Sequence, residues 1–287
     1  MLKQALLMLI LSVFSIFAES AERFSIVTSD WAAAETLSML GVTPIAIAQF
    51  RNYQGWTGNE IIREESGIDI GLKPMPNLEL ISNYEPDFLL GDNPILLQHV
   101  SKLAPTIDTS LYPFEHSPWE SVVDFTCEIA EQLDLLPEAG IVTAQANKQL
   151  AILRDQIKNK ETPVVIAQFR DDRHAWVYGE NNILHGVINQ LGLTNAWEPS
   201  ASATGLSVVT IDVLARLDGH LFIIESPAYK EWIRERLESS DIWQILISQR
   251  EGEISYIPGN FWVFGAIPSA LRFAESLVEA LNEDAVP

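Results

Sequence analysis

The sequence predicts a mixed α/β protein in which two α/β lobes are joined by a single long helix, with a ligand cleft between the lobes. Three observations support this fold. Segments typical of strands and helices alternate in both halves of the chain, as in parallel sheets covered by helices. One uninterrupted helix is predicted between the halves, over 137–161. A short pattern also occurs once in each half, which indicates two lobes of similar construction.

The first 20 residues are predicted to be a secretory signal peptide. Lys3 supplies a positive charge, and an uncharged apolar run follows over 5–17. Small residues then fit a cleavage site after Ala18 or after Ser20. The apolar run is short for a membrane span. We therefore expect a protein that is cleaved, exported and soluble.

The first lobe is predicted over 22–136. Strands are expected at short apolar runs, over 23–28, 44–50, 87–90 and 106–108, and an extended segment over 68–76. Helices are expected after capping residues or prolines, over 31–40, 77–83, 94–103 and 118–136. The polar segment 51–58 contains two glycines and is expected to be a loop.

The linking helix is predicted from Pro137 to Lys160, within the segment 137–161. Pro137 and Glu138 suit a first helical turn. Apolar residues then recur at a spacing of four and three, at Ala146, Leu150, Leu153 and Ile157. A helix of this length spans roughly 30 Å. We interpret it as a rigid connection between two lobes; the alternative is an ordinary surface helix within one domain.

The second lobe is predicted over 162–287. Its strands are expected over 164–169, 175–178, 221–225 and 254–257, and its helices over 182–191, 210–217, 230–238 and 269–281. The segment Asn77–Pro94 aligns with Thr210–Pro227 without a gap. This alignment places Glu79 and Asp212 at equivalent positions in the first turn of a helix, where the helix dipole stabilises an acidic side chain. Two equivalent acids would also suit docking to a two-fold symmetric partner.

The composition excludes several classes of partner. The chain has 39 Asp and Glu against 18 Lys and Arg, a formal net charge of −21. Nucleic acids and anionic membranes demand clustered basic residues, so neither is expected as a partner. The only cysteine, Cys127, cannot form an internal disulfide and is expected to pack inside a helix.

No motif of the sequence indicates catalysis or a resident metal. The five histidines are scattered, and the usual zinc, hydrolase and nucleotide motifs are absent. The cluster 171–174 (Asp-Asp-Arg-His) is the one dense ionisable group, and we interpret it as a salt-bridged turn. Tryptophans give a clearer signal, because Trp31, Trp56 and Trp262 lie in or beside loops that follow predicted strands, where α/β folds bind ligands.

The chain resembles the periplasmic ferric-hydroxamate-siderophore-binding proteins of bacterial ABC importers over essentially its whole mature length. The residues that carry the resemblance are Ser29-Asp30-Trp31 with Glu35, Asn52-Tyr53 with Trp56, Gly71-Leu72-Lys73 before Pro76-Asn77-Leu78-Glu79-Leu80, Arg173-His174, Asn195-Ala196-Trp197, Ile211-Asp212, Trp243-Gln244, and Trp262 with Gly265-Ala266 and Ser269-Ala270.

The resemblance implies a shallow aromatic cleft between the lobes, with ligand-binding residues Trp31, Trp56, Lys73, Trp176, Thr204, Trp262 and Phe264. Lys73 stands where the family has an arginine that donates hydrogen bonds to the hydroxamate oxygens. Two family aromatics are also missing, from the loop 91–94 and from the stretch 202–206 that contains Thr204. A siderophore already fills the coordination sphere of its iron, so no protein ligand to the metal and no cofactor are implied.

We therefore predict a non-enzymatic, monomeric protein that captures a ferric siderophore of hydroxamate type and delivers it to an inner-membrane ABC permease. By the same resemblance, Glu79 and Asp212 dock to the permease. Within the class, the alternatives are a binder of cobalamin, haem or a ferric catecholate. From other classes, they are a secreted hydrolase that uses Asp171, Asp172 and His174, or a structural or adhesion module.

Overall fold

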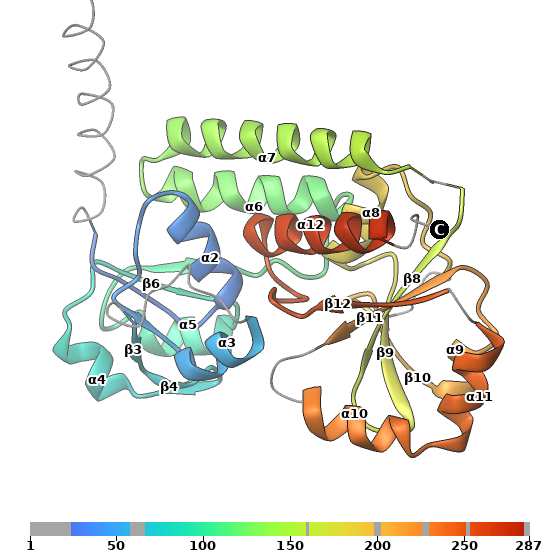
Figure 1. The fold of residues 1–287 in the computed structure, drawn as a ribbon. Coiled ribbons are helices and arrows are strands. Elements are labelled where there is room, and N and C mark those ends of the chain that lie inside the picture. The colour runs from blue at the N-terminus through green and yellow to red at the C-terminus, as the bar shows by residue number, and fades with distance from the viewer. Residues whose placement is uncertain are drawn as a thin grey trace, which may run out of the picture.

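The computed structural model describes residues 24–57, 67–158, 161–197, 202–225, 230–250 and 253–283. The predicted signal peptide lies outside these ranges. The described part forms two five-stranded sheets, a small hairpin and the helices that cover them (Figure 1). Within these ranges no helix is both long and apolar enough to cross a membrane.

The first sheet is entirely parallel, with the strand order β3-β2-β1-β6-β7. The elements of this lobe are β1 (Ile26–Thr28), α2 (Trp31–Met39), β2 (Ala46–Ile47), α3 (Phe50–Thr57), β3 (Ile68–Asp69), β4 (Gly71–Leu72), β5 (Met75–Pro76), α4 (Leu78–Asn83), β6 (Phe88–Gly91), α5 (Pro94–Val100), β7 (Thr106–Asp108) and α6 (Pro118–Gln132). Strands β4 and β5 form the separate hairpin. The predicted alternation of strands and helices is confirmed here.

The prediction of a loop over 51–58 is wrong, because the structure forms α3 there. The strand expected over 44–50 is correspondingly reduced to β2. Phe50 and Tyr53 are three residues apart and both are buried against Trp31 and Ile47, so a helix covers this cluster with one apolar face. The two glycines of the segment 51–58 had favoured the prediction of a loop over this helical spacing.

A single helix had been expected over 118–136, and the structure ends α6 at Gln132. Asp134 adopts a left-handed conformation with φ of 56°, which breaks the helix before α7 (Leu136–Gln156) begins. Helix α7 buries Ala139, Thr143, Ala146 and Leu150, so the predicted apolar stripe extends further toward its N-terminus. The helix lies along α6 and α12 and spans both lobes (Figure 1).

The second sheet is mixed, with the strand order β10-β9-β8-β11-β12. Its lobe consists of β8 (Val164–Phe169), β9 (His174–Tyr178), α8 (Ile183–Gln190), β10 (Leu206–Thr210), α9 (Ile211–Leu214), β11 (His220–Glu225), α10 (Lys230–Glu238), α11 (Asp241–Gln249), β12 (Ile254–Pro258) and α12 (Ile267–Glu283). Strands β9 and β10 run antiparallel to their neighbours, unlike the parallel arrangement expected. Neither β10 nor α11 had been predicted.

The pattern repeated in the two halves has the same place in both lobes. Asn77 caps α4 and Thr210 precedes α9, and the next strand of each copy, β6 or β11, pairs in parallel with the first strand of its lobe. The two lobes also share one large core, which includes Leu90 of the first sheet and Phe222 of the second. The lobe boundaries 22–136, 137–161 and 162–287 themselves stay a prediction.

Candidate functional site

The site is a cavity of about 270 Å³ that draws its walls from both lobes. It lies where loops leave the carboxyl ends of β1, β6, β7 and β12, which is where α/β sheets commonly bind ligands. Helices α2 and α3 flank this region on the side of the first lobe that faces the second (Figure 1). The lining residues are Asp30, Ala32, Lys73, Asp92, Thr109, Ser110, Leu111, Tyr112, Thr204, Trp262 and Phe264.

Trp262 is the centre of the aromatic part of the site. Its ring meets Trp31 with centroids 4.7 Å apart, Phe264 at 5.4 Å and Trp56 at 6.0 Å, in each case edge to face. Phe264 in turn meets Tyr112 of the first lobe at 5.9 Å. Each such pair adds to the stability gained by burying the rings. The aromatic wall is therefore a connected and rigid surface, and its exposed part is suited to stack on a bound molecule.

The charged part of the site comes from the first lobe. The Lys73 ammonium lies 3.8 Å from Asp30 Oδ1 and 3.8 Å from Asp92 Oδ2, and 5.2 Å from the centre of the Trp31 ring. Asp30 caps α2 by accepting hydrogen bonds from the amides of Ala32 and Ala33. Burial raises the pKa of the Asp30 carboxyl, and Lys73 partly offsets this. One lysine thus balances two carboxylates, and no surplus of positive charge is available for an anion.

Three polar side chains hold or line the walls without charge. Asn182 donates from its amide to the carbonyl oxygens of Thr204 and Val263, which ties two of the lining segments together. The Tyr112 and Thr109 hydroxyls are also buried, and among the described residues neither is hydrogen-bonded to another side chain. Burial raises the pKa of Tyr112, so this phenol remains protonated and able to donate.

The residues predicted to bind the ligand are only partly brought together. Lys73, Thr204, Trp262 and Phe264 line the cavity. Trp31 and Trp56 lie behind Trp262 instead of in the wall; the Trp31 indole is buried and donates to the carbonyl of Ala48 at 2.8 Å. Trp176 lies on β9 against the guanidinium of Arg170 and does not line the cavity.

Sequence reasoning missed Asp30, Asp92 and Tyr112 as parts of the wall. Asp92 follows β6 directly and Asp30 lies two residues after β1, so their place at the carboxyl edge could have been inferred from the strand assignment. No comparable signal existed for Tyr112, because its position depends on the path of the long connection between β7 and α6.

The ionisable cluster at 171–174 forms the turn between β8 and β9. Asp171 accepts hydrogen bonds from the backbone amides of Arg173 and His174 and from the His174 ring. Burial by itself raises the pKa of Asp171, but these contacts outweigh it and lower the pKa. The prediction of a turn is confirmed, but it was based on Arg173, whereas the ion pairs of the two acids join Asp171 to His174 and Asp172 to Arg236 on α10. Across the described ranges, no group of three or more His, Cys, Asp or Glu side chains is arranged to hold a metal ion.

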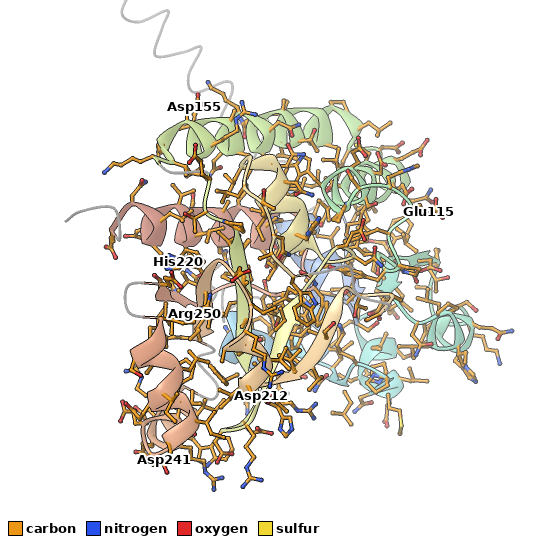
Figure 2. The ribbon with its side chains drawn as sticks, turned by 90° about the vertical axis from the view of Figure 1, so that its right-hand side faces the viewer. Glu115, Asp155, Asp212, His220, Asp241 and Arg250 are labelled. Carbon is orange, nitrogen blue, oxygen red and sulfur yellow. The ribbon has the colours of Figure 1, made fainter. Side chains whose placement is uncertain are left out.

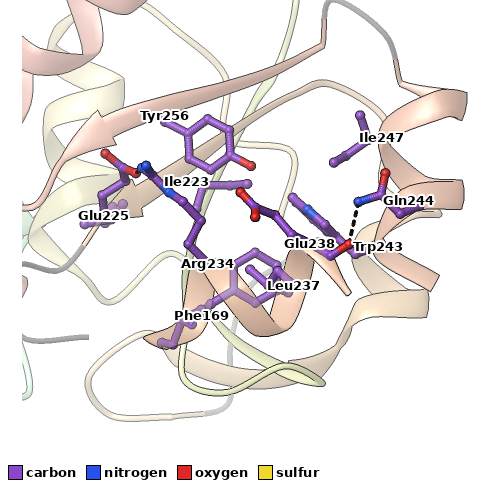
Figure 3. A pocket seen from close by; sticks show the side chains of 12 residues that line it. Phe169, Ile223, Glu225, Arg234, Leu237, Glu238, Trp243, Gln244, Ile247 and Tyr256 are labelled. Carbon is purple, nitrogen blue, oxygen red and sulfur yellow. Dashed lines mark hydrogen bonds and ion pairs between the residues drawn. The ribbon is translucent and has the colours of Figure 1, made fainter. Parts of the chain in front are cut away.

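A second cavity, of about 290 Å³, lies within the second lobe under α10 and α11 (Figure 3). Its walls include Phe169, Ile223 and Trp243, and an ion pair between Arg234 and Glu225 lies at its rim. None of its residues comes from the first lobe. It is thus separate from the site between the lobes.

The fold and the site define a two-lobed ligand-binding protein. The profile of the periplasmic binding protein family matches residues 26–260, and the chain belongs to this family. It is 27% identical to the iron(3+)-hydroxamate-binding protein FhuD of Escherichia coli strain K12 over 264 residues, 90% of this chain and 86% of that protein. It is 22% identical to the Fe(3+)-citrate-binding protein YfmC of Bacillus subtilis strain 168, over 84% and 75% of the two chains.

Solved structures show the same fold. The siderophore-binding protein FhuD of Vibrio cholerae, bound to Fe3+-Desferal, matches with a TM-score of 0.82 at 20% identity, over 92% of this chain and 99% of that one. The triscatecholate-siderophore-binding protein FeuA of Bacillus subtilis matches with a TM-score of 0.71 at 18% identity, over 91% and 93%. The resemblance drawn from the sequence is thereby confirmed. The family is one of binding proteins and not of enzymes.

Proposed function

We propose that this protein captures a ferric siderophore of hydroxamate type in the periplasm of a Gram-negative cell, without chemical change, and passes it to an inner-membrane ABC permease. The observation that carries the proposal is the cavity between the lobes, where an aromatic wall centred on Trp262 faces a single lysine held between two carboxylates. Support comes from the hydroxamate-binding relative that matches nearly the whole chain.

The charge of the cavity favours a hydroxamate over other iron chelates. Three hydroxamates neutralise Fe3+, so the core of the complex is uncharged, whereas ferric catecholates and ferric citrate are anionic. Lys73 is already engaged by Asp30 and Asp92, and an anionic chelate would meet net negative charge in the wall. A neutral complex instead gains from burying its surface against Trp262 and Phe264, and Lys73 can still donate to a hydroxamate oxygen.

The ligand is tested by titrating the mature protein with ferric Desferal, ferri-bacillibactin and ferric citrate while tryptophan fluorescence is recorded. We expect saturable quenching by ferric Desferal, with micromolar or tighter affinity, and much weaker binding of the two anionic chelates. Bovine serum albumin under the same conditions controls for absorption of light by the iron complexes. Tighter binding of a catecholate or citrate complex, or quenching by none of the three, would overturn the proposal.

The permease is proposed to meet Glu79 on α4 and Asp212 on α9. Both acids are exposed in the first turn of equivalent helices, and α4 and α9 lie on opposite flanks of the molecule (Figure 1). Asp212 projects from the end of the second lobe remote from Asp155 on α7 (Figure 2). Its carboxylate accepts from Thr210 and pairs with Arg216, and an incoming arginine would have to compete with this local pair.

This part of the proposal is tested by charge reversal in cells that depend on the protein for siderophore uptake. The variants Glu79→Arg and Asp212→Arg are expected to lose iron uptake while the purified proteins keep their affinity for the siderophore. Glu131→Arg, at an exposed site on α6, is the matched control and should transport normally. Normal uptake by the double variant would refute docking through these acids.

A further inference from the structure

A buried carboxylate links the two lobes directly behind the ligand cavity. Glu35 lies on α2 of the first lobe with no exposed surface. Its Oε1 accepts a hydrogen bond of 2.6 Å from the hydroxyl of Ser269 on α12 of the second lobe, and one of 3.1 Å from the Tyr53 hydroxyl. The two hydrogen-bonded residues Glu35 and Ser269 are 234 positions apart in the chain. This contact is therefore a tertiary junction between the lobes.

The same hydroxyl fixes the backbone at the centre of the aromatic wall. The amide of Trp262 donates to Ser269 Oγ at 2.9 Å. A continuous chain of hydrogen bonds therefore runs from Glu35 through Ser269 to the residue whose ring lines the cavity. Gly265 closes over this chain so tightly that a Cβ there would lie 2.6 Å from Ser269 Oγ and 2.9 Å from Glu35 Oε2. The fit leaves little freedom for the segment that carries Trp262.

The second carboxylate oxygen of Glu35 distinguishes this junction from an ordinary buried hydrogen bond. Oε2 is buried and, within the described ranges, accepts no hydrogen bond from a side chain. A buried charge that is incompletely paired is costly. Burial raises the pKa of Glu35 to about 7, although the Ser269 hydroxyl, the Arg272 guanidinium, the Tyr53 hydroxyl and the backbone amide of Ala266 all favour the charged form. The side chains come from α12 and α3, and the amide belongs to the loop that leads into α12.

We propose that Glu35 is a positioning residue for the ligand cavity, which acts through Ser269 to hold the backbone of Trp262 and to keep the two lobes joined. The carboxyl group holds this junction best when it is protonated, since the uncharged acid tolerates the dry surroundings of Oε2. When the carboxyl group ionises, water gains access and the Trp262 segment opens more often. The expected effect on siderophore affinity rests on the function proposed above, whereas the role of Glu35 in the junction does not.

The junction is tested first without any ligand, by hydrogen exchange of the Trp262 amide measured by NMR and corrected for the intrinsic effect of pH. In the closed state burial raises the pKa of Glu35 to about 7, and in an open, hydrated state its pKa returns to the ordinary value of 4.5. Raising the pH from 5 to 7 therefore favours opening, and protection should fall by on the order of tenfold per pH unit and level off above pH 7.

Variants test separately the two hydrogen bonds that connect Glu35 to Ser269 and Ser269 to Trp262. Glu35→Gln keeps an oxygen that can accept from Ser269 but cannot ionise, so protection of the Trp262 amide should persist and lose its dependence on pH. Ser269→Ala removes the acceptor of that amide, and exchange should become faster at every pH. The matched controls are Glu279→Gln, at an exposed position of α12, and Ser276→Ala, at a buried position of the same helix. Both controls should behave like the wild type.

The second measurement is the affinity for ferric Desferal by isothermal calorimetry at pH 6. Ser269→Ala and Glu35→Ala should weaken binding at least fivefold, and Glu35→Gln should restore most of the affinity lost in Glu35→Ala. The proposal is overturned by protection of Trp262 that does not change with pH in the wild type, or by Ser269→Ala with normal exchange. If the wild type bound no Desferal, the proposed ligand would fail while the exchange measurements still decided the role of Glu35.

Discussion

The two lobes contribute different chemistry to one cavity. The first lobe supplies the charges, with Lys73 between Asp30 and Asp92, whereas the second supplies the exposed aromatic surface of Trp262 and Phe264. On the function proposed above, we expect the charged side to set which net charge a ligand can have and the aromatic side to supply most of the binding free energy. Affinity and selectivity should accordingly be separable by mutation, one lobe at a time.

The largest effect is expected on the aromatic side, from Trp262→Ala. This change removes the ring that lines the cavity and also the edge-to-face contacts with Trp31 and Phe264. A loss of about 2–3 kcal/mol is expected from the buried ring, which raises the Kd for ferric Desferal by about 30- to 150-fold. Fluorescence or calorimetric titration measures this change. Trp232→Ala, at an exposed position of α10, is the matched control, and an equal loss there would show that the effect is not specific.

A smaller loss is expected on the charged side, from Lys73→Ala. The variant lacks a donor to the ligand and leaves the buried Asp30 without its main cation, which raises the pKa of that carboxyl further. We expect a Kd about tenfold higher for ferric Desferal, in line with the loss of one charge-assisted hydrogen bond. Lys73→Arg should retain or improve affinity, since the guanidinium is also a cation and can donate two parallel hydrogen bonds. The exposed Lys102→Ala is the control, and an unchanged Kd in Lys73→Ala would exclude contact with the ligand.

The two lobes also differ in how well their secondary structure could be predicted from the sequence. The parallel sheet of the first lobe follows from its apolar runs, whereas in the second lobe the antiparallel β10 was missed. Its exposed Val208 and short alternation are those of an edge strand, which gives a weak local signal. The helix α3 was missed because its glycines hid the burial of Phe50 and Tyr53. Local pattern therefore failed where tertiary packing decided the conformation.

For the site, residues named from the resemblance fell into two groups. Lys73, Thr204, Trp262 and Phe264 line the cavity, while Trp31 supports the wall from behind. A sequence identifies an aromatic residue near the site but not whether its ring faces the ligand or a neighbouring ring. The linkage of Glu35 to Trp262 through Ser269 was similarly out of reach, because it joins helices from opposite ends of the described chain.

The smallest effect, and the sharpest test of the division between lobes, is expected from Asp92→Asn. Asp92 is half-exposed and pairs with Lys73 across 3.8 Å, so water screens much of its charge. Neutralising it frees part of the positive potential of Lys73, and affinity for ferric citrate should rise about two- to fivefold, whereas affinity for ferric Desferal, which carries an ammonium group outside its neutral iron core, should not rise. The gain should shrink in about 0.5 M salt, where the Debye length is only a few ångströms. Asp155→Asn, on the outer surface of α7, is the matched control (Figure 2). An equal gain for both chelates would mean that Asp92 governs affinity in general, and that selectivity for charge does not reside in the first lobe.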